Sequence, residues 1–455
     1  MFLAFLLGLF AWAGRPPLPR PEAVYWEEGR DPRVAIVKFR DDASIYAEEG
    51  KVHGVDAALR EILGEVQLLP KFASGIRRDG PIDLRTYVRL ESPAAEVLAT
   101  ELLADPRVES AWLAPLPPPP PEDIPPVTPD FVAEMAWLGP VGPDFVEAAR
   151  WPGGRGAYVT VADIEYAFTA DHEDLAGRVP PAVWGWESGD YAFHGTMVLG
   201  MLTAGNNGYG MTGAVDESEV LVLSPYDARR WYDVAAAVLA AVELLVPGDV
   251  LLIEQQGFRN GTYCPASIEP DVFDAIAAAT AAGIVVIEPS GNGEADLDDR
   301  VWNGWFDREI QDSGSVMVGG GVPPGDLTEP ARSWGGSSYG GRIDVQGWYG
   351  EVATLTDGEQ GGYYADLFFP DGDGRQGYTS FFSGTSSASA MVAAAAAVAQ
   401  SVHVATTGAP MSPSELRALL VSTGSPQTGA SSAAIATHRI GPQPDLRRLL
   451  RSRIR

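Results

Sequence analysis

A chain of 455 residues with 45% hydrophobic residues is long enough to bury a substantial core. It has 61 acidic and 32 basic side chains, and the resulting net charge of −29 at pH 7 argues against nucleic acid or an anionic membrane surface as a partner. The single cysteine, Cys264, excludes an intramolecular disulfide and a zinc-finger spacing.

The N-terminus begins with a short apolar segment. Residues 2–13 are apolar and end in Ala-Trp-Ala, which is typical of a signal-peptidase site. The segment is too short to span a bilayer as a helix, which needs about 20 residues. We therefore expect a signal peptide over residues 1–13 and a protein secreted to the periplasm or the medium. A buried N-terminal helix is the alternative, because no Lys or Arg precedes the apolar run.

The next hundred residues predict a small α+β domain over residues 14–115. Alternating apolar residues predict strands over 33–42 and 85–92, a helix spans 55–66, and a further helix and strand complete the pattern. A proline-rich segment follows, which favours extended polyproline II structure and has no sheet or helix partner. We expect it to be a linker over residues 116–128.

The remainder, residues 129–455, alternates apolar strands with helices. Such strands predict an α/β fold with a mostly parallel sheet covered by helices on both faces. The predicted strands cover 158–164, 219–225, 249–257, 283–291 and 315–321. Helices are predicted over 232–246 and 270–283, and a capping box at Ser412 and Glu415 begins another. In parallel sheets of this kind, ligands bind at the carboxyl ends of the strands.

Four polar residues lie near predicted strand ends or helix starts: Asp163, His194, Asn292 and Ser386. Each alone has an ordinary explanation as a cap, a turn residue or a partly buried histidine. Together they supply a nucleophile, a base, a carboxylate that orients the base, and an amide that donates to an oxyanion. Their residue types and placement therefore make Asp163, His194 and Ser386 candidate catalytic residues, with Asn292 as the candidate donor to the oxyanion.

At these residues the sequence resembles the subtilisin-like serine proteases. The chain order Asp, His, Ser is theirs, and His-Gly-Thr at 194–196 and Ser-Gly-Thr-Ser-Ser-Ala-Ser at 383–389 look like the family's two helix-starting motifs. The resemblance covers about residues 158–450. It implies a subtilisin-like fold, an N-terminal propeptide over residues 14–115, and substrate binding by Gln255, Gln256 and Gly257.

The sequence departs from the family pattern in three places. Ala390 replaces a proline of the serine motif, Leu199 replaces an alanine of the histidine motif, and Glu254–Gly257 replaces the usual Ser-Leu-Gly of the substrate-binding strand. None of these changes removes a predicted catalytic group. The last one leaves the substrate preference open.

The predicted function is a secreted serine endopeptidase that acts on proteins or peptides and is inhibited by its own propeptide. The alternative is a peptide-binding module on a protease scaffold with little or no turnover, motivated by the unusual Glu254–Gly257 segment. No cofactor is expected for the chemistry, and neither nucleic acid nor membrane is an expected partner. Structural calcium is left open, and no residues are assigned to it. The acidic residues 294–299 lack the spacing of an EF-hand, and we expect them to form a solvated loop.

Overall fold

The computed structural model describes residues 18, 20–26, 30–72, 83–116, 128–323, 334–358, 365–429 and 432–452. The chain divides into two compact units, Met1–Ile124 and Pro125–Arg455. The predicted signal peptide, residues 1–13, and residues 117–127 of the predicted linker lie outside the described residues.

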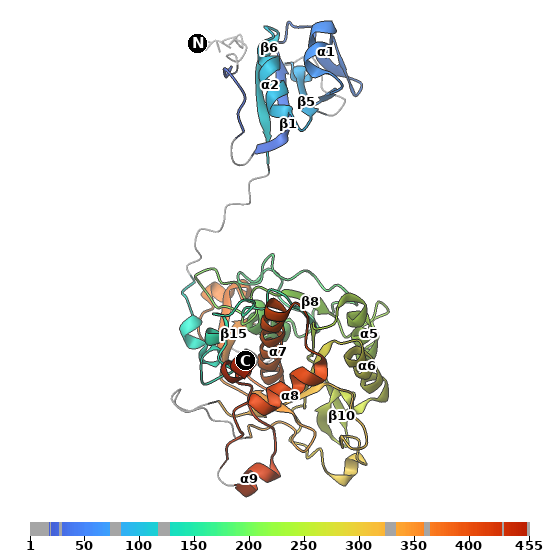
Figure 1. Ribbon diagram of the computed structural model, residues 1–455, viewed down its shortest axis with the longest axis vertical. Coiled ribbons are helices and arrows are strands. Elements are labelled where there is room, and N and C mark those ends of the chain that lie inside the picture. The colour runs from blue at the N-terminus through green and yellow to red at the C-terminus, as the bar shows by residue number, and fades with distance from the viewer. Residues whose placement is uncertain are drawn as a thin grey trace, which may run out of the picture. The chain divides into compact units, whose positions relative to one another are not determined.

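The N-terminal unit is an antiparallel sheet packed against two helices (Figure 1). The strand order is β4-β5-β1-β6, and the apolar residues of β1 and β5 that alternate toward the helices are fully buried with them in one cluster. A separate hairpin is formed by β2 and β3. The elements are β1 (Arg30–Phe39), β2 (Tyr46–Glu48), β3 (Lys51–His53), α1 (Ala57–Leu63), β4 (Leu68–Pro70), β5 (Tyr87–Glu91), α2 (Ala95–Leu103) and β6 (Val108–Pro115).

The α+β architecture predicted for this region is confirmed. The sequence did not predict the three-residue strands β2, β3 and β4, which are too short to show an alternating pattern.

The second unit is built on a six-stranded sheet whose order is β14-β13-β12-β9-β7-β8. Every neighbouring pair in this sheet is parallel, and nearly every strand residue is buried, which accounts for the continuous apolar runs in the sequence. The predicted parallel sheet is confirmed. Its strands are β7 (Thr160–Ile164), β8 (Glu219–Leu223), β9 (Val250–Ile253), β12 (Val285–Pro289), β13 (Val316–Gly321) and β14 (Val345–Trp348).

Helices cover both faces of this sheet. Helices α4 and α7 pack on one face, and α5 and α6 lie side by side on the other (Figure 1). Helix α7 is long and apolar enough to cross a membrane, but 83% of its most apolar window is buried inside this unit, as expected for a core helix. The helices are α3 (Phe145–Ala148), α4 (Ala192–Thr203), α5 (Val234–Leu244), α6 (Pro270–Ala281), α7 (Thr385–Thr407), α8 (Pro413–Thr423), α9 (Ser432–Thr437) and α10 (Leu446–Ser452).

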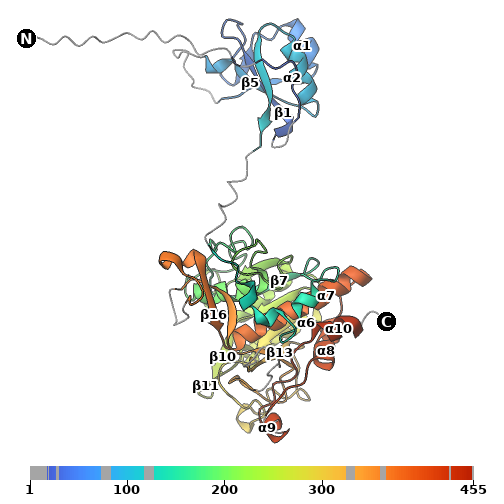
Figure 2. The same cartoon turned by 90° about the vertical axis from the view of Figure 1, so that its left-hand side faces the viewer.

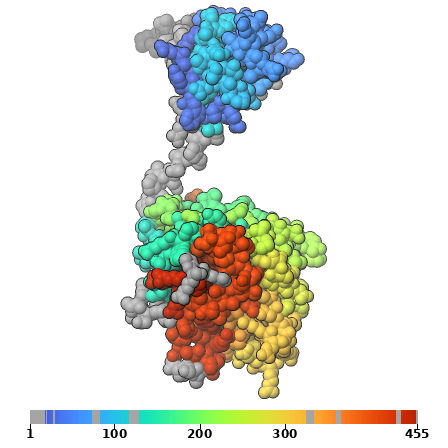
Figure 3. Space-filling model, in the orientation of Figure 1, coloured from blue at the N-terminus to red at the C-terminus, as the bar shows by residue number. Residues whose placement is uncertain are grey.

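Two antiparallel hairpins, labelled in part in Figure 2, add to the sheet and helices: β10 (Gln256–Arg259) with β11 (Thr262–Pro265), and β15 (Val352–Thr356) with β16 (Gly377–Phe382). The space-filling view shows the chain's C-terminal part, in red, covering much of the face of the second unit that is turned to the viewer (Figure 3). The capping box predicted for α8 is present, with Ser412 and Glu415 each bonding to the other's backbone N–H. That box fixes the start of the helix.

Candidate active site

A histidine and a glutamate form the centre of the site. His194 is the third residue of α4, and its Nδ1 lies 2.6 Å from Oε2 of Glu165, the residue directly after β7. Glu165 is fully buried, and its other oxygen accepts the N–H of Tyr166 at 3.0 Å. A carboxylate held in this way fixes the orientation of the imidazole and its Nδ1–H tautomer.

Gly195 allows this close approach. A Cβ at Gly195 would lie 2.2 Å from the carbonyl oxygen of Ala167 and 2.6 Å from Cγ of Glu165. Any side chain there would push the start of α4 away from the carboxylate. The glycine that follows His194 is thus required by packing at the site.

The prediction that Asp163 orients His194 is wrong in geometry. Asp163 lies inside β7, it is fully buried, and neither of its carboxylate oxygens has a hydrogen-bond partner. Because side chains alternate along a strand, Asp163 and Glu165 share a face, but Asp163 lies about 7 Å further back from the strand end. Glu165, beyond the strand end, is the carboxylate that reaches α4.

Ser386 is the second residue of α7 and is half-buried at the helix start. Its hydroxyl makes no hydrogen bond within the described residues, and neither does Nε2 of His194. Both residues line the same cavity of about 530 Å³. The N–H groups of a first helical turn have no intrahelical partner, so that of Ser386 is available to an anion at this helix terminus.

Asn292 follows β12 and is held against the start of α7. Its Oδ1 accepts the backbone N–H of Thr385 at 2.8 Å and the Thr385 hydroxyl at 3.2 Å. Its own backbone N–H donates to Oε1 of Gln256 at 3.0 Å. The Nδ2 group has no partner within the described residues, and Asn292 lines the cavity with Ser386. The amide is therefore oriented as a donor into the cavity.

Two of the three predicted substrate-binding residues line the cavity, and the third does not. Gln255 and Gln256 line the cavity, and Oε1 of Gln255 accepts the hydroxyl of Tyr232 at 2.9 Å. Gly257 pairs with Cys264 in the β10–β11 hairpin and is not among the cavity-lining residues. A Cβ at Gly257 would lie 2.6 Å from Ile268, so close packing accounts for this glycine.

Electrostatics favour a charged histidine. Burial lowers the pKa of His194, but the charge and hydrogen bond of Glu165, with a further contribution from Glu254, outweigh it and raise the pKa to about 9. Burial raises the pKa of Asp163 well above its usual range, and the charge of Glu165 adds to this. A nucleophile, a histidine and an amide donor thus line one cavity at the carboxyl ends of the strands, and the buried carboxylate of Glu165 contacts the histidine.

A family model described as "Subtilase family" matches residues 154–441. The chain belongs to the subtilase family. Members are usually serine endopeptidases, and the matched region contains Glu165, His194, Asn292 and Ser386. No curated protein matches the chain.

Solved structures support the subtilase fold. Proteases from Pseudoalteromonas arctica are similar with a TM-score of 0.51 at 18% identity, covering 71% of this chain and 99% of theirs. The epidermin leader peptide processing serine protease of Staphylococcus aureus is similar with a TM-score of 0.50 at 13% identity, covering 93% of this chain and 99% of its own. At such identities the similarity concerns the fold alone.

Several aromatic residues of this subtilase's cavity were not predicted. Tyr166, Tyr191, Tyr263 and Tyr349 line it. Tyr166 stacks with Tyr232 at a ring-centroid distance of 6.4 Å and lies 5.3 Å from Tyr191. Tyr166 directly follows Glu165, so the sequence places one of these tyrosines next to the carboxylate that contacts His194. No pattern in the sequence links the others to the site.

Among the described residues no group of three or more His, Cys, Asp or Glu side chains is arranged to hold a metal ion. The acidic residues 294–299 instead make local contacts: Asp298 accepts the N–H of Gly341, and Asp299 caps a short 3₁₀ turn. Structural calcium therefore stays open, with no residues assigned to it.

Proposed function

We propose that this subtilase is a serine endopeptidase with Ser386 as nucleophile, His194 as general base and acid, and Glu165 in place of the usual aspartate. The observation that carries the proposal is the 2.6 Å contact between His194 and Glu165, with the free Nε2 of His194 lining the same cavity as Ser386. Glu165 orients the ring and stabilises its cationic form.

In the proposed reaction, Oγ of Ser386 bonds to the peptide carbonyl carbon while its proton passes to Nε2 of His194. The C–N bond of the tetrahedral intermediate then breaks, and the same proton moves to the leaving amine. Water repeats the sequence on the acyl-enzyme, taking the place of Ser386 as nucleophile and releasing the acid.

The oxyanion hole of the proposed mechanism consists of Nδ2 of Asn292 and the backbone N–H of Ser386. Both are fixed before substrate arrives, since Asn292 is anchored to Thr385 and Ser386 lies in the first turn of α7. Donors that need no reorganisation stabilise developing charge most effectively.

The proposal includes secretion, protein or peptide substrates and inhibition by the N-terminal unit until that unit is removed. The apolar residues 2–13 support export, and the proline-rich segment before Thr128 supports processing. Thr128 is buried and donates to Glu173 at 2.6 Å, so a cut before it leaves the catalytic unit's own start anchored.

Fluorophosphonate labelling and casein cleavage test the proposal. Wild-type protein should show both, and Ser386→Ala should show neither. Ser387→Ala is the matched control, because Ser387 is the adjacent serine and its hydroxyl is bound to the carbonyls of Trp348 and Gly384. A folded, processed wild type that is not labelled would favour the peptide-binding alternative.

A further inference from the structure

A second glutamate lies beside Glu165. Strands β7 and β9 are parallel, with Asp163 opposite Leu252 and Ile164 opposite Ile253. The next pair in this register is Glu165 and Glu254, and the N–H of Glu254 donates to the carbonyl of Ile164 at 3.3 Å. Because side chains alternate along a strand, both glutamates extend from the face that α4 and α7 cover.

Glu254 is buried and only half satisfied. Glu254 is 6% exposed. Its Oε1 accepts the hydroxyl of Ser389 at 2.7 Å, and its Oε2 has no hydrogen-bond partner. A buried carboxylate oxygen without a partner costs stability unless an opposite charge compensates it. Glu254 lines the cavity together with His194, and among the described lining residues His194 is the one side chain able to carry a positive charge.

The surroundings of His194 contain carboxyls and no other cation among the described residues that line the cavity. Glu165 faces it from the end of β7 and Glu254 from the end of β9. Asp163 lies behind them in β7, where its charge acts on Glu165 and Glu254. The tyrosines Tyr166 and Tyr191 also line this cavity. From α7, Thr385 and Ser386 line the cavity, and the hydroxyl of Ser389 donates to Glu254. From β16 the ring of Phe382 lies 5.8 Å from the imidazole.

We propose that Glu254 is a positioning residue for the catalytic reaction: with Glu165 it stabilises the imidazolium form of His194 and thereby sets the pH above which Ser386 is activated. This inference rests on the proposed function. It concerns the charge on His194 and not contact with substrate, since Oε2 of Glu254 is closed to solvent.

The titration directions agree with this role. Burial raises the pKa of Glu254 well above its usual range, and the positive charge on His194 offsets only part of that rise, so Glu254 acts on His194 only at the pH values at which its own carboxyl is ionised. Reciprocally, Glu254 contributes to raising the pKa of His194. Where both groups are ionised, the two charges therefore stabilise each other.

Glu254→Gln tests the inference, because the amide keeps an acceptor for Ser389 and removes the charge. Glu288→Gln is the matched control: Glu288 is also fully buried in this sheet, on β12, but bonds to Ser267 and Ser315 and not to the site. The chain has five histidines, so ¹³C-labelled imidazole signals can be followed by NMR, with that of His194 assigned by its loss in His194→Gln.

In Glu254→Gln the titration midpoint of His194 should fall by roughly one to two pH units, as expected for removing one charge at short range. The acidic limb of the fluorophosphonate labelling rate should move to lower pH by the same amount. Glu288→Gln should leave both at the wild-type position. An unchanged midpoint in Glu254→Gln overturns the inference.

If Glu254→Gln does not fold, Glu254→Met replaces the side chain with an uncharged one of similar length and should give the same shift. Failure of the proposed function has a different signature. In that case wild type and all variants resist labelling, while the NMR midpoint still reports whether Glu254 acts on His194.

Discussion

Two carboxylates lie two residues apart on β7 and its end, and only one of them meets the histidine. Glu165→Gln should keep the geometry but lower kcat by about 10³–10⁴, because the amide stabilises neither the correct tautomer nor the imidazolium. Asp163→Asn should lower kcat far less, since Asp163 makes no hydrogen bond to His194. Steady-state kinetics on one peptide substrate compare the two. The reverse order of effects would restore Asp163 as the orienting residue.

Asp163 should instead affect the pH dependence of stability. Its pKa is raised by burial, so the unfolded chain ionises this group while the folded chain keeps it protonated. Stability is therefore lost as pH rises above the ordinary aspartate range. Asp163→Asn cannot titrate and should lose less unfolding free energy between pH 5 and pH 8 than wild type, measured by urea denaturation. Parallel curves for the two proteins would contradict this expectation.

His194 gives a pH prediction for activity. Its pKa, raised to about 9, means that the neutral imidazole needed as a base is scarce at neutral pH. The kcat/KM of wild type should therefore rise with pH up to about 9, and an acidic limb near pH 6 would contradict the expectation.

Asn292→Ala should lower kcat by roughly 10²–10³ with little change in KM.

The residue types of the site were predictable, and one position was not. His194, Asn292 and Ser386 meet in one cavity because strand ends and helix starts of a parallel sheet converge. The carboxylate was misplaced by two residues although the predicted strand ends where β7 does. Asp163 and Glu165 share a face, and only the packing of α4 decides which of them reaches His194. The segment Glu254–Gly257 was noted as unusual, but the place of Glu254 beside Glu165 was missed because cross-strand neighbours depend on register. The tyrosines were missed because they come from segments far apart in the sequence.

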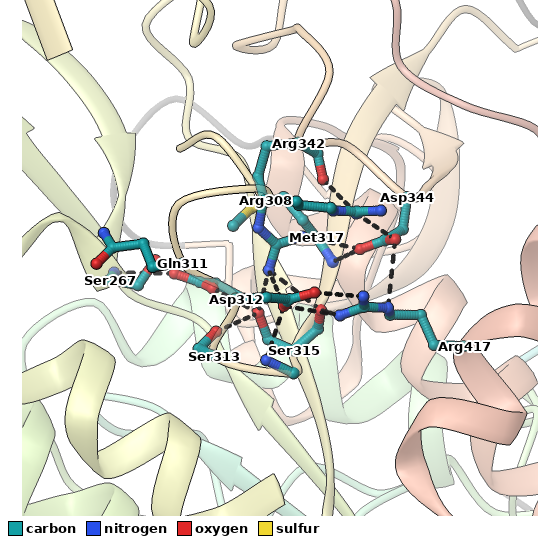
Figure 4. Close-up of polar contacts among 12 residues, drawn as sticks. Ser267, Arg308, Gln311, Asp312, Ser313, Ser315, Met317, Arg342, Asp344 and Arg417 are labelled. Carbon is teal, nitrogen blue, oxygen red and sulfur yellow. Dashed lines mark hydrogen bonds and ion pairs between the residues drawn. The ribbon is translucent and has the colours of Figure 1, made fainter. Parts of the chain in front are cut away.

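At the scale of elements, a charged network joins α8 to the sheet (Figure 4). Asp344 precedes β14 and is almost fully buried. Its Oδ2 accepts from Arg342 and from the N–H of Met317, each at 2.9 Å, and Oδ1 pairs with Arg308 and lies 3.6 Å from Nε of Arg417. One carboxylate thus contacts three guanidinium groups, and Asp312 also pairs with Arg417.

Asp344→Asn should therefore destabilise the fold by about 3–5 kcal/mol, the usual cost of leaving buried charges without their partner. Guanidinium chloride unfolding measures it. Asp312→Asn is the control: Asp312 pairs with Arg417 but is more exposed, so its loss should cost less. An equal loss of unfolding free energy in both variants would mean that the stabilisation comes only from the contacts with Arg417 of α8.

The elements that the sequence missed are short or irregular. The hairpin β10–β11 has two four-residue strands, and β11 ends in Pro265. Its turn, Asn260-Gly261, has φ values of 55° and 80°, and this dipeptide is the strongest short-range hairpin signal. That signal was present in the sequence. Five of the six strands of the parallel sheet were predicted from their apolar runs, and β14 was missed because its sequence, Val-Gln-Gly-Trp, is short and interrupted by Gln and Gly.

At the scale of the whole molecule, the two units predict processing. The N-terminal unit has its own buried core, so it can fold as a unit and be removed without exposing the core of the other. Wild type should be cut between Glu122 and Thr128 and lose roughly 110 residues after signal removal. At 48.4 kDa for 455 residues, this corresponds to about 12 kDa. Ser386→Ala should keep the N-terminal unit.

The last prediction separates self-processing from processing by another protease. Purified Ser386→Ala mixed with active wild type should be cut in the same 122–128 segment, because its proline-rich sequence favours an extended chain that a protease can bind. N-terminal sequencing of the product locates the cut. Ser386→Ala alone, incubated equally long, should stay intact, and Ser387→Ala should process itself. If Ser386→Ala is cut in the absence of wild type, another protease removes the N-terminal unit. If active wild type keeps that unit covalently attached and uncut, the unit is a permanent domain and not a propeptide.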